Sequence, residues 1–239
     1  MNSLDSQPAI WKAQLPGRPL SGLTVLVVED SRSASEAMRL LCLRSGARIR
    51  RADCLRAAMR HLQTYRPSVV IVDMGLPDGN GAELISQIKA SGSQSPIVLA
   101  ISGNPDMQEY ALQAGAADFL PKPIESLAVF QQAILAALPA GAGPRGPRIL
   151  PDDIITPGND ALRDDLTHVA AILNSASDGT AINYIARFLT GVARSAHDTV
   201  LAEAAATLAR DHEAGRGVAT DLTRISDLLQ DRLASAGTA

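Results

Sequence analysis

The stretch Ser68-Val-Val-Ile-Val-Asp73-Met-Gly-Leu-Pro77-Asp-Gly79 decides the fold of this chain. Its run of β-branched residues predicts a strand buried on both faces, and such strands are typical of parallel sheets covered by helices. The glycines and the proline that follow predict a turn. An acidic residue, Asp73, therefore stands at the carboxyl end of a buried strand, which is the edge where open α/β sheets bind their ligands.

Outward from this stretch, short apolar runs alternate with segments of helical period, a pattern that predicts strand–helix repeats. The other expected strands are residues 24–28, 47–50, 96–101 and 117–120. The expected helices are residues 33–44, 55–65, 82–90, 105–114 and 125–138. These elements predict a five-stranded, parallel, doubly wound α/β domain over residues 23–138.

The rest of the chain divides into three parts. Residues 1–22 are polar and contain three prolines, so we expect an irregular tail. Residues 139–158 are rich in proline and glycine and predict a linker. Residues 159–239 have helical periodicity throughout, with apolar faces along 162–173, 182–200 and 222–233 that predict three helices. Three short helices make a thin core, so we expect these faces to pack on a second copy, giving a homodimer, or on a partner helix.

Composition and charge narrow the function. The chain has 239 residues, of which 46% are hydrophobic and 20% charged, and no apolar run has the length of a membrane span. Because no apolar run could span a membrane, we expect no membrane contact. The two cysteines, Cys42 and Cys54, have no metal-ligand spacing, which favours a cytoplasmic protein with reduced thiols. Residues 1–151 hold 15 Lys and Arg against 12 Asp and Glu, whereas residues 152–239 hold 7 against 13. A net charge of −6 makes DNA an unlikely partner of the helical domain.

Acidic residues gather at the predicted strand ends. Glu29 and Asp30 follow the first strand, and Asp73 ends the third. Carboxylates that converge at one edge repel one another unless a cation lies among them, and hard oxygen ligands favour Mg²⁺. Ser102 ends the fourth strand and Lys122 follows the fifth, so a hydroxyl and an ammonium group are expected at the same edge. Together these groups suit an anionic phosphoryl group.

The strand-end residues resemble those of the receiver domain of two-component response regulators, over about residues 23–138. The resemblance depends on four motifs: Val-Val-Glu29-Asp30-Ser, Val-Asp73-Met-Gly-Leu-Pro77-Asp-Gly79, Ala-Ile-Ser102-Gly and Phe119-Leu-Pro-Lys122-Pro123. Each motif alone is weak, whereas four in order, each at a strand end, are specific. The resemblance implies a flavodoxin-like receiver domain followed by a small all-helical domain.

It also implies a role for each residue of the site. Asp73 would accept the phosphoryl group, and Lys122 would pair with it. Asp30 and Asp73 would bind Mg²⁺ directly, with the Gly75 carbonyl as a further ligand and Glu29 acting through water.

A second implication concerns the switch. Ser102 and Phe119 stand where the family has its switch residues, and the Lys122–Pro123 bond is cis in the family. A phosphoryl group at Asp73 would draw in Ser102 and Lys122 and shift the loops that lead into the helices at 105–114 and 125–138. The second of these helices continues into the linker and would carry the signal to the helical domain.

Each of these residues, taken alone, also has an interpretation without function. Glu29-Asp30 could be an acidic helix start, Asp73 a turn residue, and Lys122 a solvated loop lysine. We expect a response regulator that is not itself an enzyme, phosphorylated by a histidine kinase or a histidine phosphotransfer protein. The main rival hypothesis is an enzymatic helical domain, a histidine phosphotransfer or phosphatase module that uses His168 or His197. Two weaker hypotheses are DNA binding through an atypical set of helices and a receiver that serves as a scaffold without being phosphorylated.

Overall fold

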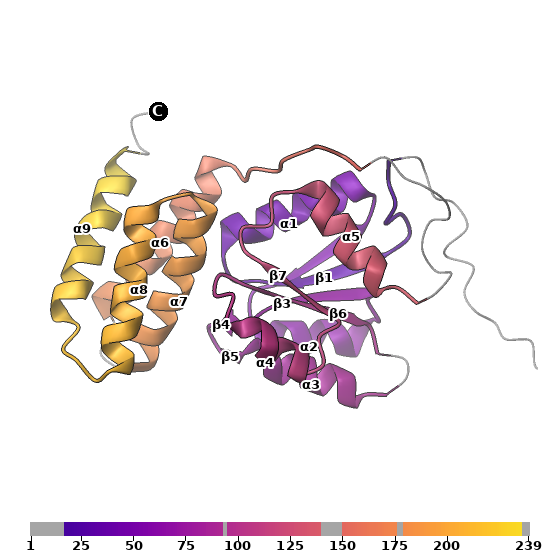
Figure 1. Cartoon of the computed structure of the whole chain (residues 1–239), viewed down its shortest axis with the longest axis horizontal. Helices are drawn as coiled ribbons and strands as arrows, with labels where there is room; N and C mark the ends of the chain where they lie inside the picture. The colour runs from indigo at the N-terminus through magenta and orange to yellow at the C-terminus, as the bar shows by residue number, and fades with distance from the viewer. Residues whose placement is uncertain (1–16, 93–94, 140–149, 176–178, 236–239) are drawn as a thin grey trace, which may run out of the picture.

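The sheet at the centre of the first domain has five parallel strands in the order β2-β1-β3-β6-β7. The computed structural model describes residues 17–92, 95–139, 150–175 and 179–235 (Figure 1). The strands are β1 (Thr24–Val28), β2 (Arg48–Ala52), β3 (Val69–Asp73), β6 (Ile97–Ser102) and β7 (Asp118–Pro121). The five-stranded, doubly wound prediction is confirmed. The hairpin of β4 (Gly75–Leu76) and β5 (Gly79–Asn80) was not predicted, because strands of two residues have no detectable period.

Five helices cover the two faces of the sheet (Figure 1). The helices α1 (Arg32–Ser45) and α5 (Leu127–Ala137) lie on one face. The opposite face carries α2 (Leu55–Thr64), α3 (Gly81–Ala90) and α4 (Met107–Gln113). The helix predicted from Pro105 begins two residues later, since the Asn104 side chain accepts a hydrogen bond from the Asp106 amide and closes a turn there.

The strand order reverses beside β1, and this places the site. The chain passes from β1 outward to β2 and then back across to β3, so the loops after β1 and β3 part and leave a crevice between them. Glu29, Asp30 and Asp73 stand at this crevice. All five residues of β3 are buried, which fixes the backbone from which Asp73 projects.

The second domain is a bundle of four helices, not three. They are α6 (Asn159–Ser175), α7 (Gly179–Ser195), α8 (Thr199–Glu213) and α9 (Ala219–Ser235). The apolar series predicted over 182–200 is broken after Ser195, where His197 has a φ of 53° and Asp198 caps α8 by accepting from the Leu201 amide. Val200 is 45% exposed and does not belong to the apolar face.

The fourth helix lets the bundle close its own core. Its buried apolar residues come from all four helices and include Leu166, Ile185, Leu189, Leu208 and Leu229. The expectation that the chain leaves these faces uncovered is therefore wrong. Homodimer formation remains a prediction, but uncovered apolar faces on the bundle no longer support it. Among the helices in the described ranges, none combines the length and the hydropathy needed to cross a membrane.

The predicted tail and linker are partly ordered against the α/β domain. Leu20 is fully buried, and its amide donates to the Ser45 carbonyl, because a large apolar side chain interrupts the polar tail. In the linker, Ile155 is buried and its amide donates to the Glu125 carbonyl, while the Leu127 amide donates to the Asp153 carbonyl. Residues 1–16 and 140–149 of these two segments lie outside the described residues.

We predict that Gly81→Ala destabilises the α/β domain by about 1–3 kcal/mol, the usual cost of overpacking. A Cβ at Gly81 would lie 2.1 Å from the backbone oxygen of Asp73, so α3 or the end of β3 must move. Gly75→Ala is the matched control, because its Cβ would meet no atom closer than 3.7 Å. Urea unfolding of both variants checks this. Equal midpoints for Gly81→Ala and the unaltered protein would contradict it.

Candidate functional site

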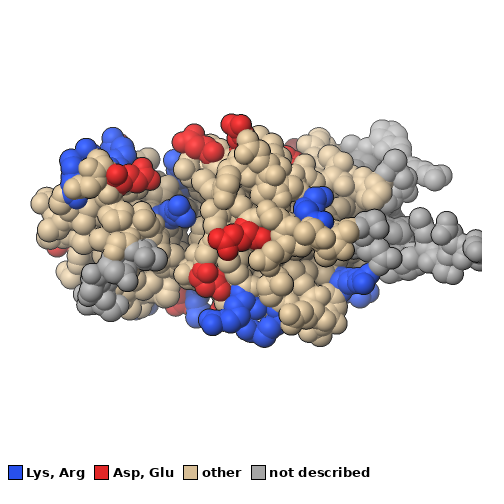
Figure 2. Space-filling model, turned by 90° about the horizontal axis from the view of Figure 1, so that it is seen from below, with Lys and Arg blue, Asp and Glu red and all other residues tan. Residues whose placement is uncertain are grey.

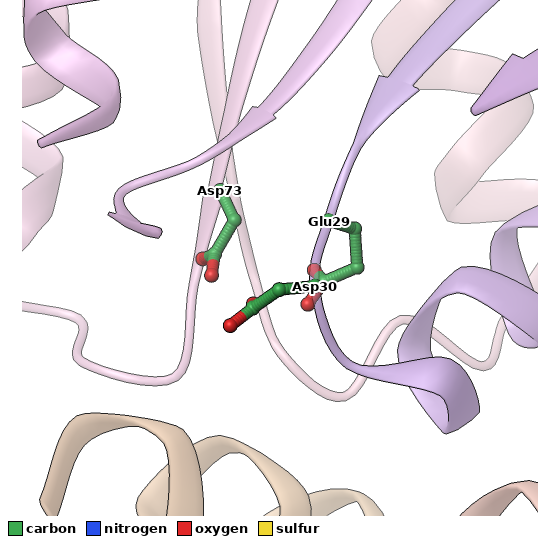
Figure 3. A group of neighbouring side chains, drawn as sticks. All are labelled: Glu29, Asp30 and Asp73. Atoms are coloured by element: carbon green, nitrogen blue, oxygen red, sulfur yellow. The ribbon is translucent and has the colours of Figure 1, made fainter. Parts of the chain in front are cut away.

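Three carboxylates meet at the carboxyl ends of β1 and β3 (Figure 3). One oxygen from each of Glu29, Asp30 and Asp73 lies within 4.8 Å of the others. Glu29 and Asp73 are only 4% and 7% exposed, so this charge is held away from bulk water. The structure thus places the three predicted carboxylates together at one edge of the sheet.

Lys122 supplies the positive charge of the cluster. Its Nζ lies 2.6 Å from Glu29 Oε2 and 3.2 Å from Asp73 Oδ1, and its side chain is 7% exposed. The Lys122 amide donates to the Ser102 carbonyl at 2.8 Å, which aligns the loop after β7 with the end of β6. The Lys122–Pro123 bond is cis, as the resemblance implies.

The pKa values of Glu29, Asp30 and Lys122 all lie above their ordinary values in this crowded cluster. Burial, opposed by Lys122 but reinforced by Asp73, raises the pKa of Glu29 to about 8. Burial and the charge of Asp73 raise the pKa of Asp30 to about 7. Burial lowers the pKa of Lys122, but the charges of Asp73 and Glu29 outweigh it and raise the pKa above its ordinary value. A lone ammonium does not balance three carboxylates.

The donor set fits a divalent cation. Glu29 Oε2 is buried and accepts no hydrogen bond of good geometry, and its close cation is Lys122. Asp30 and Asp73 present oxygens on either side of one space (Figure 3). Hard oxygen donors, few in number and leaving room for water, are what Mg²⁺ requires. Gly75, in β4, follows Asp73 closely enough to add its carbonyl to this set.

The two residues predicted as a switch differ in their surroundings. Ser102 is 8% exposed at the end of β6, and its Oγ accepts a hydrogen bond from the Asn104 amide at 3.1 Å. Phe119 is 6% exposed and packs in the apolar core beneath α2, α3 and α4. Any response of Phe119 must therefore begin from a packed position.

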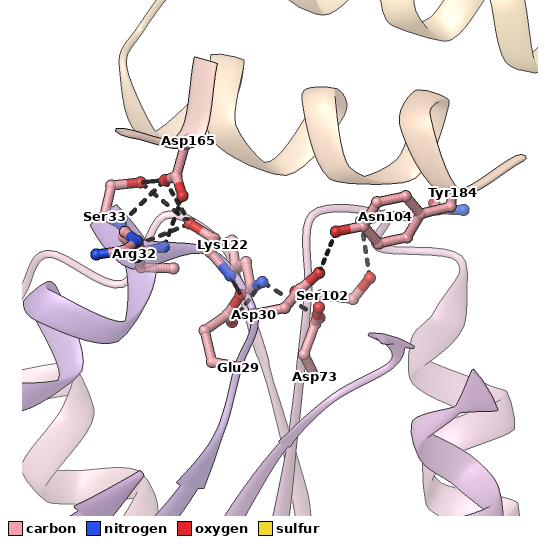
Figure 4. A network of polar contacts seen from close by, with 12 residues as sticks. Glu29, Asp30, Arg32, Ser33, Asp73, Ser102, Asn104, Lys122, Asp165 and Tyr184 are labelled. Atoms are coloured by element: carbon pink, nitrogen blue, oxygen red, sulfur yellow. Dashed lines mark hydrogen bonds and ion pairs between the residues drawn. The ribbon is translucent and has the colours of Figure 1, made fainter. Parts of the chain in front are cut away.

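Sequence reasoning missed the contribution of the helical bundle. Tyr184 of α7 donates a hydrogen bond through its hydroxyl to Asp30 Oδ2 at 2.7 Å, and Asp165 of α6 binds the start of α1 (Figure 4). Arg187 also faces this edge, since its Cδ lies 3.7 Å from the position of a Cβ on Gly75. No local pattern marks these residues, because their partners are more than 100 residues away in the chain.

A cavity of about 450 Å³ lies between the two domains. Its receiver-side wall contains Glu29, Asp30, Asp73, Ser102 and Lys122, and its bundle-side wall contains Arg187, Arg194 and Arg210. The acidic cluster thus faces a partly open cavity that has room for a hydrated ion and a phosphoryl group.

The two histidines considered for phosphotransfer lie at the border of this interface. His168 is exposed, and its Nε2 is 3.4 Å from the Tyr184 hydroxyl. His197 lies farther out: its side chain is 71% exposed, and its Nε2 is 2.9 Å from Glu125 Oε1. Neither histidine belongs to the carboxylate cluster.

Comparison with known families identifies the first domain. Residues 25–134 match the model of the response regulator receiver domain. The fold, the carboxylates at the ends of β1 and β3 and the lysine after β7 agree with this match. Residues 25–134 are therefore a response regulator receiver domain, and no family was identified for the helical bundle.

The relatives of the chain are response regulators. The KDP operon transcriptional regulatory protein KdpE of Escherichia coli is 34% identical over 99 residues, which are 41% of this chain and 44% of that protein. The virulence transcriptional regulatory protein PhoP of Salmonella typhimurium is 33% identical over 117 residues, 47% of this chain and 52% of that protein. A solved response regulator from Chloroflexus aurantiacus is 27% identical, with a TM-score of 0.44, and covers 48% of this chain and 98% of its own.

The two curated relatives match less than half of this chain, 41% and 47% of it. The chain spans about half the length of the curated relatives it matches. Two of them are named as transcriptional regulators, so the expectation that DNA is an unlikely partner finds no support in them. On the face shown in Figure 2, acidic and basic side chains are interspersed over both domains.

We predict that Asp30→Asn raises the melting temperature of the metal-free protein more at about pH 8 than at about pH 5. The raised pKa of Asp30 means that the folded state holds a proton more tightly than the unfolded state does. Stability is therefore lost as the pH rises from the ordinary value of 3.8 to about 7, and an uncharged amide avoids that loss.

Melting curves in the presence of a chelator measure the effect. Asp227→Asn is the control, because Asp227 is an exposed carboxylate on α9, far from the cluster in the fold. An equal gain from Asp30→Asn at both pH values would contradict the prediction.

Proposed function

We propose that the chain is a response regulator of a two-component phosphorelay that accepts a phosphoryl group on Asp73. One observation carries this proposal: Asp73 lies beside Asp30, Glu29 and Lys122 in a buried acidic cluster at the topological switch point of a receiver fold. The phosphoryl donor would be a histidine kinase or a histidine phosphotransfer protein.

Each residue of the cluster has a task in this reaction. An Asp73 carboxylate oxygen forms the bond to phosphorus while the phosphorus–nitrogen bond of the donor breaks. The electron pair of that bond returns to the donor imidazole, which takes up a proton and leaves neutral. Asp30, Asp73 and the Gly75 carbonyl would hold Mg²⁺, with Glu29 acting through water. The ion would neutralise charge that three carboxylates otherwise present to an incoming anion.

Lys122 and Ser102 would hold the new phosphoryl oxygens. Lys122 already lies 3.2 Å from Asp73 Oδ1, so it needs only a small shift to pair with a phosphoryl group there. Ser102 would exchange its hydrogen bond from the Asn104 amide for one to the phosphoryl group, which moves the loop toward α4. Phe119 would repack in response, through contact and not through a hydrogen bond.

The output would be a protein contact made by the helical bundle. A histidine phosphotransfer output is the second candidate, because His168 approaches Tyr184, which in turn contacts Asp30. Replacement of His168 by Gln separates the two: a phosphotransfer output loses transfer to a downstream acceptor, whereas an interaction output keeps its partner binding.

We predict that phosphoramidate and Mg²⁺ place one base-labile phosphate on the chain, and that Asp73→Asn abolishes it. A chelator should also block the labelling, because the repulsion among the carboxylates is then uncompensated. Intact-mass measurement before and after alkaline treatment follows the label.

Asp106→Asn serves as the matched control, since Asp106 is an exposed carboxylate at the rim of the same cavity. Labelling that persists at full stoichiometry in Asp73→Asn would overturn the assignment.

A further inference from the structure

A carboxylate from the bundle binds the first turn of α1. Asp165 is 1% exposed, and its oxygens accept hydrogen bonds from the Arg32 amide at 2.6 Å and the Ser33 amide at 3.0 Å. They also accept from the hydroxyls of Ser31 at 2.9 Å and Ser33 at 2.6 Å (Figure 4). The first amides of a helix lack partners within the helix, and a negative charge there is favourable. Asp165 is therefore a strong point of attachment between the two domains.

A second attachment lies inside the acidic cluster. The Tyr184 hydroxyl donates to Asp30 Oδ2, while its ring packs against Phe188 at a centroid distance of 5.5 Å. Burial and the charge of Asp30 raise the pKa of this phenol above its ordinary value, so it remains a donor at neutral pH. The bundle thus bonds directly to a residue of the site.

The loop after β6 is a third point of contact. A Cβ on Gly103 would lie 3.0 Å from the Gly191 Cα, so the two backbones approach as closely as glycines allow. Arg194 of α7 donates to the Gly103 carbonyl. With Asp165 and Tyr184, this contact places α7 across the edge of the sheet at which Asp73 lies (Figures 1 and 4).

These contacts are polar, and the two domains keep separate cores. The apolar cluster of the bundle contains only residues between Leu162 and Leu233, and the two clusters of the receiver contain none of them. The bundle can therefore leave the receiver without exposing either core, as is typical of interfaces between mobile domains. Ile155 stays anchored on the receiver, and residues 156–158, which span about 10 Å when extended, can act as the tether.

The cavity is too small for a protein donor. A single turn of helix, about 10 Å across and 5.4 Å long, would nearly fill its volume of about 450 Å³. A hydrated ion or a small phosphate compound fits, whereas a histidine presented on a folded protein does not.

We propose that the α6–α9 bundle is a built-in cover of the phosphoacceptor site, latched by Asp165 and Tyr184. A protein phosphodonor and the bundle compete for the same surface, formed by the start of α1, the β4 edge and the loop after β6. The donor reaches Asp73 only after the bundle has swung away. This consequence rests on the proposed function, whereas the cover itself does not.

Size-selective labelling tests the cover without any phosphorylation. Gly75→Cys places a thiol at the edge of the cavity, where a Cβ meets only ordinary contacts, and Cys54→Ser removes the half-buried native thiol. Cys42 is buried, and burial raises its pKa to about 12, so it stays unreactive. The probes are N-ethylmaleimide and a maleimide attached to a folded carrier protein.

We expect N-ethylmaleimide to react readily, and the carrier-bound maleimide to react slowly. Adding Asp165→Ala should accelerate labelling by the carrier-bound probe alone. The expected acceleration is roughly tenfold, because losing a helix cap costs a free energy of that order. Tyr184→Phe keeps the ring, loses the hydroxyl and should also accelerate the carrier-bound probe. If Asp165→Ala misfolds, Tyr184→Phe still tests the proposal. Glu203→Ala, an exposed carboxylate on α8, is the matched control and should change neither rate.

Fast carrier-bound labelling in the unaltered background, or no acceleration by either latch variant, would overturn the cover. Failure of phosphoramidate to label Asp73 would instead overturn the proposed function and leave the labelling result intact. The two failures are therefore distinguishable.

Discussion

The repulsion among three carboxylates, two buried and one half-buried, is the constraint on which the rest of this structure depends. The strand order brings Glu29, Asp30 and Asp73 together, and β3 is buried along its whole length, so the chain cannot relieve the repulsion by spreading the strands. Relief must come from added groups. Lys122 supplies one positive charge, protonation supplies another at low pH, and the Tyr184 hydroxyl supplies a hydrogen bond. A divalent cation would supply more than any of these.

How much of this the sequence predicts depends on how local each feature is. Asp73 and Lys122 are predictable because each follows a run of strand-forming residues, and parallel strands bring their carboxyl ends to one edge. The four helices of the bundle are not predictable in this way. The break after Ser195 depends on a positive φ at His197, a conformation that histidine adopts only uncommonly. Leu20 and Ile155 fall within a predicted tail and a predicted linker because single apolar residues carry no period.

Contacts between the domains are invisible in the sequence for a further reason. Asp165 lies 132 residues from Ser33, and Tyr184 lies 154 residues from Asp30. Periodicity identifies the apolar face of a helix. The apolar faces of α6 and α7 pack inside the bundle, so their pattern gives no sign of a contact with the receiver. A buried aspartate and a half-buried tyrosine on the remaining face become meaningful only when the two domains are seen together (Figure 4).

The arrangement also changes the expected route of coupling. A path through α5 into the linker would be long, and the linker residue Ile155 is fixed to Glu125, in the loop just before α5. The bundle instead touches each loop that surrounds Asp73: Asp165 binds the loop after β1, Arg194 the loop after β6, and His197 the loop after β7 through Glu125. A shift of charge at Asp73 therefore meets the bundle directly, one hydrogen bond away through Asp30. In this molecule the acidic cluster and the bundle share an interface, so no helix needs to carry a signal between them.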